Sequence, residues 1–156
     1  ILEEEHPALL VSLGSGNGRH LEWVKPHGTK ATGVEISSTA ARIAVNEHTH
    51  AEIVIANIKT FLEFHPKSYN VYLFREILWY ILADWAAIVD ILKTNHQGAM
   101  VIVELSFYDD QQYGRDYFDG PDDFIAKWPF TIEKIVREHS TIKQREGRMM
   151  VAGKVA

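Results

Sequence analysis

The chain has 156 residues, 46% of them hydrophobic and 24% charged, which is the composition of a globular protein large enough for one buried core. Its formal net charge of −5 disfavours a broad nucleic-acid interface, and the absence of cysteine excludes disulfides and thiolate metal sites. No stretch approaches the roughly 20 apolar residues of a membrane-spanning helix, so we expect no membrane segment and a cytoplasmic location.

Short apolar runs alternate with helical patterns, which is typical of a parallel sheet covered by helices. Leu9–Leu13 predicts a strand buried on both faces, and residues 19–25 predict a short helix closed by Pro26 and Gly28. A second strand is expected over residues 30–36. Ser37 then offers an N-cap for a helix with one apolar face, formed by Ala40, Ala41, Ala44 and Val45.

Three more strands are expected over residues 51–57, 69–75 and 96–105. Asp84 is positioned to cap a helix before the last of them, with an apolar stripe at Trp85, Ile88, Val89 and Leu92. Residues 106–123 show no clear period and predict a long loop. The runs 130–140 and 148–156 are too close for a helical crossover, so we expect them to pair antiparallel. We expect one domain over residues 1–156.

Three glycines, Gly14, Gly16 and Gly18, end the first strand at alternate positions. Glycine adopts positive φ freely and lets another group approach its backbone, so such a loop between a strand and a helix commonly holds a nucleotide. The dinucleotide fingerprint G-x-G-x-x-G would need glycine at position 19, which is Arg19. Glu35, at the end of the second strand, is suited to accept hydrogen bonds from ribose hydroxyls. It therefore indicates a nucleoside ligand but does not distinguish one nucleoside cofactor from another.

Five motifs in order make the chain similar to the class I S-adenosylmethionine-dependent methyltransferases over almost its whole length. They are VSLGSGNGRH, GVEIS, ANIKTF, YNVYLFREILWYI and LKTNHQGAMVIVE. The resemblance implies an α/β fold with a doubly wound, mostly parallel seven-stranded sheet, helices on both faces and an antiparallel last strand (Rossmann-like). It also implies S-adenosylmethionine as methyl donor and S-adenosylhomocysteine as product, with the donor across the ends of the first, second and fourth strands.

The resemblance also assigns roles around the cofactor. The backbone of the loop would press against the methionine portion, and Glu35 would bind the ribose diol. Asn57 stands where the family usually has an acid that accepts from the adenine amino group. Arg75 ends the fourth strand, where it could pair with a carboxylate or bridge to an acid on the rim. The expected cofactor-binding residues are Gly14, Ser15, Gly16, Gly18, Glu35, Ile36, Asn57, Ile58 and Arg75, with Ile36 and Ile58 placed to sandwich the adenine ring.

Catalytic residues are harder to assign. Glu76 could steady the donor's amino group or serve as a base, and Tyr113 lies in the loop after the fifth strand, either a lid facing the substrate or a loop packed by its own aromatics. The sequence FREI replaces the Asn/Asp-Pro-Pro-aromatic tetrapeptide of amino-methylating DNA enzymes, so no DNA substrate is expected. Only His48-x-His50 has a metal-like spacing, on an expected surface helix end, so no metal is expected.

We therefore expect methyl transfer to oxygen or nitrogen of a small-molecule acceptor. One alternative is a catalytically incomplete S-adenosylmethionine-binding module; a less favoured one is an NAD-type oxidoreductase. Because eight residues precede Leu9, we expect the N-terminal cap of the family to be short or missing. The sequence does not indicate the oligomeric state.

Overall fold

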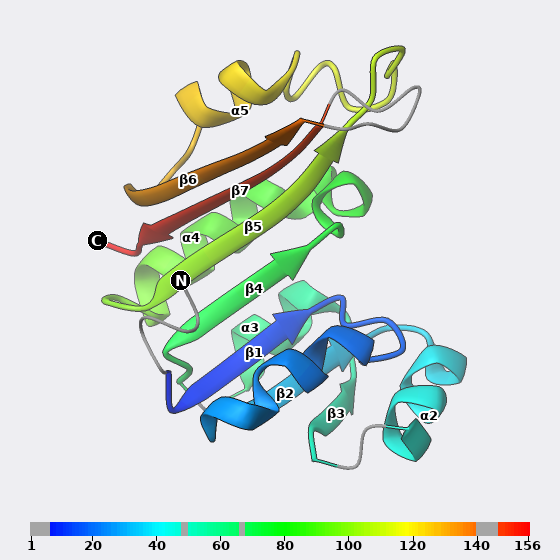
Figure 1. Cartoon of the computed structure of the whole chain (residues 1–156). Helices are drawn as coiled ribbons and strands as arrows, with labels where there is room; N and C mark the ends of the chain where they lie inside the picture. The colour runs from blue at the N-terminus through cyan, green and yellow to red at the C-terminus, as the bar shows by residue number, and fades with distance from the viewer. Residues whose placement is uncertain (1–6, 48–49, 66–67, 140–146) are drawn as a thin grey trace. The chain divides into compact units, whose positions relative to one another are not determined.

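Seven strands in the described parts of the chain form one sheet in the order β3-β2-β1-β4-β5-β7-β6 (Figure 1). The computed structural model describes residues 7–47, 50–65, 68–139 and 147–156. β7 lies between β5 and β6 and runs antiparallel to both. The predicted α/β fold, with a mostly parallel seven-stranded sheet and an antiparallel last strand, is therefore confirmed.

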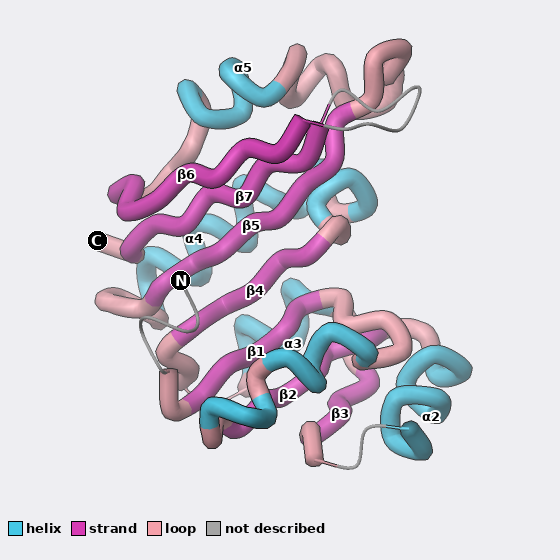
Figure 2. The backbone as a smooth tube through the Cα atoms, viewed as in Figure 1, coloured by secondary structure: helices cyan, strands magenta, loops and turns pink. Residues whose placement is uncertain are grey.

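The chain forms two compact units, Ile1–Leu73 and Phe74–Ala156, and β4 (Val71–Arg75) contains the boundary between them. In the first unit, β1 (Leu9–Leu13), β2 (Lys30–Glu35) and β3 (Glu52–Ile55) pair in parallel. Every side chain of β1 except the half-buried Leu9 is buried, as its continuous apolar run predicted. The helical elements are η1 (Arg19–Trp23), η2 (Lys25–His27), α2 (Ser38–Glu47) and α3 (Ile58–Phe64). Figure 2 colours helices cyan and strands magenta.

Two helical predictions in the first unit need correction. The short helix expected over residues 19–25 is a pair of 3₁₀ helices. Gly28 closes the pair with a left-handed φ of 72°, as predicted, whereas Pro26 lies inside η2. Ser37 Oγ accepts from the Ala40 N–H at 3.3 Å, as predicted for a cap. Ala41 and Ala44 are buried, but Val45 is 51% exposed because it lines an open apolar groove between α2 and β3.

Tyr72 is a fully buried titratable group of the first unit. Its hydroxyl oxygen accepts from the Tyr69 N–H at 3.2 Å, and burial raises the pKa of Tyr72 to about 12. An exposed phenol ionises near pH 10, so stability contributed by this shift is complete below pH 10 and is lost as pH rises through 12. We expect urea unfolding to show a loss of about 2–3 kcal/mol between pH 10 and pH 12 that Tyr72→Phe lacks. Parallel losses in both proteins would refute this assignment.

The described residues of the second unit form the last three strands in chain order, two α-helices and two 3₁₀ helices. β7 (Gly147–Lys154) pairs along its length with β5 (Met100–Phe107) and with β6 (Thr131–His139), as predicted for the terminal runs. Ser140 and residues 141–146 lie outside the described residues. The helical elements are η3 (Leu78–Tyr80), η4 (Leu82–Asp84), α4 (Trp85–Asn95) and α5 (Pro121–Ala126). In the described parts of the chain, no helix is long and apolar enough to span a bilayer.

The apolar stripe of α4 is buried as predicted, but the capping role of Asp84 is wrong. Asp84 has helical backbone angles (φ −96°, ψ −7°) and makes no side-chain cap bond. An N-cap normally needs extended backbone to aim its side chain at the first N–H groups, and η4 already occupies this position. β5 also extends to Phe107, and α5 begins at Pro121, so both ends of the predicted loop 106–123 are regular structure.

Candidate functional site

The glycine loop after β1 uses left-handed backbone at all three glycines. The φ angles are 75° at Gly14, 56° at Gly16 and 76° at Gly18, a region where a Cβ is strained. The N–H groups of Gly14 and Ser15 both donate to the carbonyl oxygen of Val34, at 2.8 and 2.9 Å. This conformation explains why glycine occupies each alternate position.

The loop presents its backbone to open space at Gly16. A Cβ built there would meet no heavy atom within 4 Å. Ser15, in contrast, is buried against Gly33 of β2, where a Cβ would lie 2.6 Å from Ser15 Oγ. Ser15 Oγ has no hydrogen-bond partner among the described residues. The loop is therefore anchored at Ser15 and accessible at Gly16.

Glu35 connects this loop to α2. Its Oε2 accepts from the Gly16 N–H and its Oε1 accepts from the Ser37 N–H, both at 2.8 Å. Each carboxylate oxygen has a further lone pair, and the side chain is half-buried rather than enclosed. The carboxylate is thus fixed by two backbone segments while it can still accept from a ligand hydroxyl.

The three residues predicted around adenine lie in different environments. Ile36 is 69% exposed, whereas Ile58 is 7% exposed and packs in the core at the start of α3. Asn57 is the N-cap of α3, and its Oδ1 accepts from the N–H groups of Lys59 (2.9 Å) and Thr60 (3.4 Å). The predicted acceptor oxygen of Asn57 is therefore committed to the cap, and Ile58 does not offer a free apolar face.

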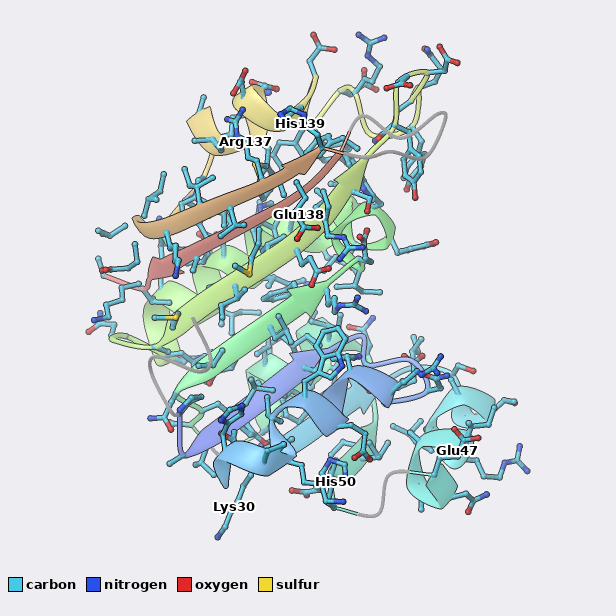
Figure 3. The ribbon with its side chains drawn as sticks, viewed as in Figure 1. Lys30, Glu47, His50, Arg137, Glu138 and His139 are labelled. Carbon is cyan, nitrogen blue, oxygen red and sulfur yellow. The ribbon has the colours of Figure 1, made fainter. Side chains whose placement is uncertain are left out.

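Arg75 bridges to an acid, the second of the roles predicted for it. Its Nε lies 3.0 Å from Oε2 of Glu104 on β5, and Arg148 of β7 places Nη1 3.3 Å from Glu104 Oε1. Glu138 of β6 points toward Arg148, at 4.0 Å, while Arg137 and His139 point to the side of α5 (Figure 3). Glu104 is therefore held between two guanidinium groups.

Glu76 directly follows β4 and has a φ of 55°, the only positive φ at a non-glycine residue in the described parts of the chain. Its Oε2 accepts from the Ser106 N–H at 3.0 Å, and its Oε1 accepts from the Ser106 hydroxyl at 2.5 Å. The indole N–H of Trp79 donates to the Ser106 carbonyl oxygen at 3.0 Å. No sequence pattern points to Ser106, because its contact with Glu76 depends on the pairing of two strands.

The loop that contains Tyr113 has one buried aromatic ring and three exposed ones. Phe118 is buried and packs edge-on against Phe124 of α5, whereas the tyrosines Tyr108, Tyr113 and Tyr117 are exposed. Near the start of α5, a hydrogen bond from Lys127 and one from the Asp119 N–H lower the pKa of Asp123. The loop is therefore packed down by one aromatic ring and presents three others to solvent.

His50, the second histidine of the His48-x-His50 pair, contacts η1. His50 contacts the Leu21 carbonyl oxygen and Glu22, both at 3.2 Å, and His48 lies outside the described residues. Across residues 7–47, 50–65, 68–139 and 147–156, no group of three His, Asp or Glu side chains has metal-binding geometry.

Comparison with known proteins identifies the class. Residues 11–103, more than half of the chain, match the family model described as a methyltransferase domain. The chain therefore belongs to this family, as predicted, and is an S-adenosylmethionine-dependent methyltransferase. No curated protein sequence matches it significantly.

Solved structures of methyltransferases share the fold. The N-methyltransferase NodS from Bradyrhizobium japonicum, solved with S-adenosylhomocysteine, is 15% identical with a TM-score of 0.77, over 99% of this chain and 81% of NodS. A Methanosarcina mazei S-adenosylmethionine-dependent methyltransferase is 15% identical, with a TM-score of 0.70 over 94% and 91% of the two chains. The methyltransferase domain of a bacterial Hen1 protein is 15% identical, with a TM-score of 0.70 over 98% and 93%.

Proposed function

We propose that this chain, acting as a single catalytic domain, transfers a methyl group from S-adenosylmethionine to oxygen or nitrogen of a small-molecule acceptor. The observation that carries the proposal is the Glu35 carboxylate, fixed by the N–H groups of Gly16 and Ser37 beside an accessible glycine loop. An anion held in this way suits a ribose diol, because two hydroxyl donors can add to its remaining lone pairs.

The residues of the first unit fit the donor. Gly14, Gly16 and Gly18 would hold the methionine portion through their backbone, with Ser15 as the buried anchor of the loop. Ile36 would cover the adenine with its exposed apolar face. Asn57 would contribute its NH₂ group to an adenine ring nitrogen, since its oxygen caps α3. Ile58 and Arg75 have weaker support, because the first is buried and the second is paired with Glu104.

Four considerations support an oxygen or nitrogen acceptor on a small molecule. S-Adenosylmethionine supplies a methyl group already activated by a sulfonium, so the chain mainly has to orient the acceptor, which can contribute roughly 7–11 kcal/mol. The chain contains no cysteine that could activate an unreactive carbon by covalent attack. Its net charge of −5 and the FREI sequence at the end of β4 disfavour DNA. NodS, which shares the fold, is an N-methyltransferase.

The test combines cofactor binding with product formation. Calorimetric titrations with S-adenosylmethionine, S-adenosylhomocysteine and NAD are expected to give micromolar binding for the first two and none for NAD. Mass spectrometry then follows S-adenosylhomocysteine in an acceptor panel of primary amines, alcohols, phenols, carboxylates and pyridines, where we expect turnover of at least one class. Binding without any turnover would favour a catalytically incomplete module over the proposed transferase.

A further inference from the structure

We infer that Ser106 is a positioning residue that holds the Glu76 carboxylate as the proton acceptor for the group being methylated. This inference rests on the proposed function and deepens it. It restricts the acceptor to a class that must lose a proton, namely a hydroxyl or an ammonium group.

Two hydrogen bonds from one residue fix the carboxylate. Ser106 donates its backbone N–H to Glu76 Oε2 and its hydroxyl to Oε1, and Ser106 itself is fully buried in β5. Glu76 directly follows the carboxyl end of β4, and Ser106 is one residue from the carboxyl end of β5. Ligands of α/β sheets gather at these strand ends, so the carboxylate stands where an acceptor can reach it.

Ser106 is itself held by a third hydrogen bond. Its carbonyl oxygen accepts from the Trp79 indole N–H, so its N–H, hydroxyl and carbonyl groups are all used. Trp79 is buried and is packed by Gly114, where a Cβ would lie 2.8 Å from the indole ring. The donor pair facing Glu76 therefore belongs to a buried, hydrogen-bonded part of the second unit.

The backbone of Glu76 is also in an unfavourable conformation. Its φ of 55° is disfavoured for a residue with a long side chain, and its N–H donates to the Glu104 carbonyl oxygen at 2.8 Å. Strain of this kind collects at functional sites, where the surrounding structure holds it in place. Glycine or asparagine would relieve the strain, so the presence of glutamate indicates a use for its carboxylate.

The charges distinguish Glu76 from the neighbouring acid. Glu104 is neutralised by Arg75 and Arg148, whereas Glu76 forms no ion pair among the described residues and receives its hydrogen bonds from neutral donors. Each Glu76 oxygen keeps a lone pair, and the side chain is half-buried. Of this pair, Glu76 is thus the carboxylate that has no cationic partner among the described residues.

The proton transfer balances with methyl transfer. The acceptor's oxygen or nitrogen uses a lone pair to bond the methyl carbon, and the electron pair of the broken carbon–sulfur bond stays on the sulfur of the product S-adenosylhomocysteine. The proton that the acceptor loses passes to Glu76, which releases it to water. A pyridine nitrogen, which carries no proton at neutral pH, needs no such base.

The first experiment uses Glu76→Gln, which has nearly the same shape and can keep both contacts because the Ser106 hydroxyl can reverse its direction. For alcohols, phenols or amines that the wild-type chain methylates, we expect kcat to fall by about 10²–10⁴-fold. The affinity of the variant for S-adenosylmethionine, measured by calorimetry, is expected to stay within about threefold of wild type. The substitution removes the proton acceptor and leaves cofactor binding unchanged.

The second experiment uses Ser106→Ala, with Ser106→Thr as the variant that keeps the hydroxyl. Loss of a donor to the carboxylate disfavours its ionised form, so the acidic limb of the pH–kcat profile is expected to move to higher pH. Ser106→Thr is expected to restore the wild-type profile. Ser12→Ala, which removes another buried serine hydroxyl, bonded to His20 at 2.7 Å, is the matched control and should leave the profile unchanged.

Several outcomes would overturn the inference. Activity of Glu76→Gln within threefold of wild type on alcohols or amines would remove Glu76 as the base. An unshifted profile in Ser106→Ala, with Glu76→Gln inactive, would remove Ser106 as its positioning residue. Turnover of pyridines alone would overturn the inference and leave the proposed function intact, whereas no turnover of any acceptor would overturn both.

Discussion

Replacement of Glu35 by alanine is expected to weaken S-adenosylmethionine binding by on the order of a hundredfold. Charge-assisted hydrogen bonds contribute roughly 1.5–3 kcal/mol each, and each 1.4 kcal/mol is a factor of ten in affinity. The substitution removes the acceptor for the proposed ribose hydroxyls and releases the Gly16 and Ser37 N–H groups that the carboxylate now holds. Isothermal titration calorimetry on both proteins measures the effect.

Two further variants separate these contributions. Glu35→Gln keeps one oxygen acceptor but places an NH₂ group opposite one of the two N–H donors, so an intermediate loss of about tenfold is expected. Glu47→Ala, at the other end of α2, is the matched acidic control and should bind like the wild type. If folded Glu35→Ala binds S-adenosylmethionine within threefold of wild type, Glu35 only holds the glycine loop and does not bind the cofactor.

Replacement of Glu104 by methionine is expected to lower the free energy of unfolding by about 2 kcal/mol. Removing one member of a buried ion-pair network leaves its partners uncompensated, at a cost of roughly 3–5 kcal/mol when fully buried. Glu104 is 13% exposed, but the side chains of Arg75 and Arg148 are 28% and 39% exposed, so solvent screening reduces this figure. Urea unfolding of the two proteins measures the difference.

The triple variant Arg75→Met, Glu104→Met, Arg148→Met is the control for this network. Three apolar side chains of similar volume leave no charge unpaired, so the triple variant should recover most of the stability that Glu104→Met loses. Arg75→Met alone also tests the cofactor role predicted for Arg75. If the guanidinium serves only Glu104, S-adenosylmethionine affinity will change by less than threefold, and a tenfold loss would instead support the cofactor role. A Glu104→Met loss below 0.5 kcal/mol, about the scale of a surface pair, would refute the network.

The sequence by itself determined the alternation of strands and helices, the order of the elements and the glycine loop. These features follow from local chemistry: apolar runs must be buried, and Gly14, Gly16 and Gly18 permit the left-handed turns that other residues resist. The buried stripe of α4 follows from the helical period in the same way. The antiparallel pairing of β6 and β7 follows from the short connection between them.

Only the tertiary structure decided what the polar side chains contact. Asn57 and Glu35 both stood at the ends of strands, but Asn57 Oδ1 is used by the cap of α3, and Glu35 connects two backbone segments. Arg75 meets Glu104, and Glu76 meets Ser106, across about 30 residues of chain. Local sequence patterns specify which backbone forms and which residues are buried, whereas the partner of a charged side chain depends on strand register, which the whole sheet sets.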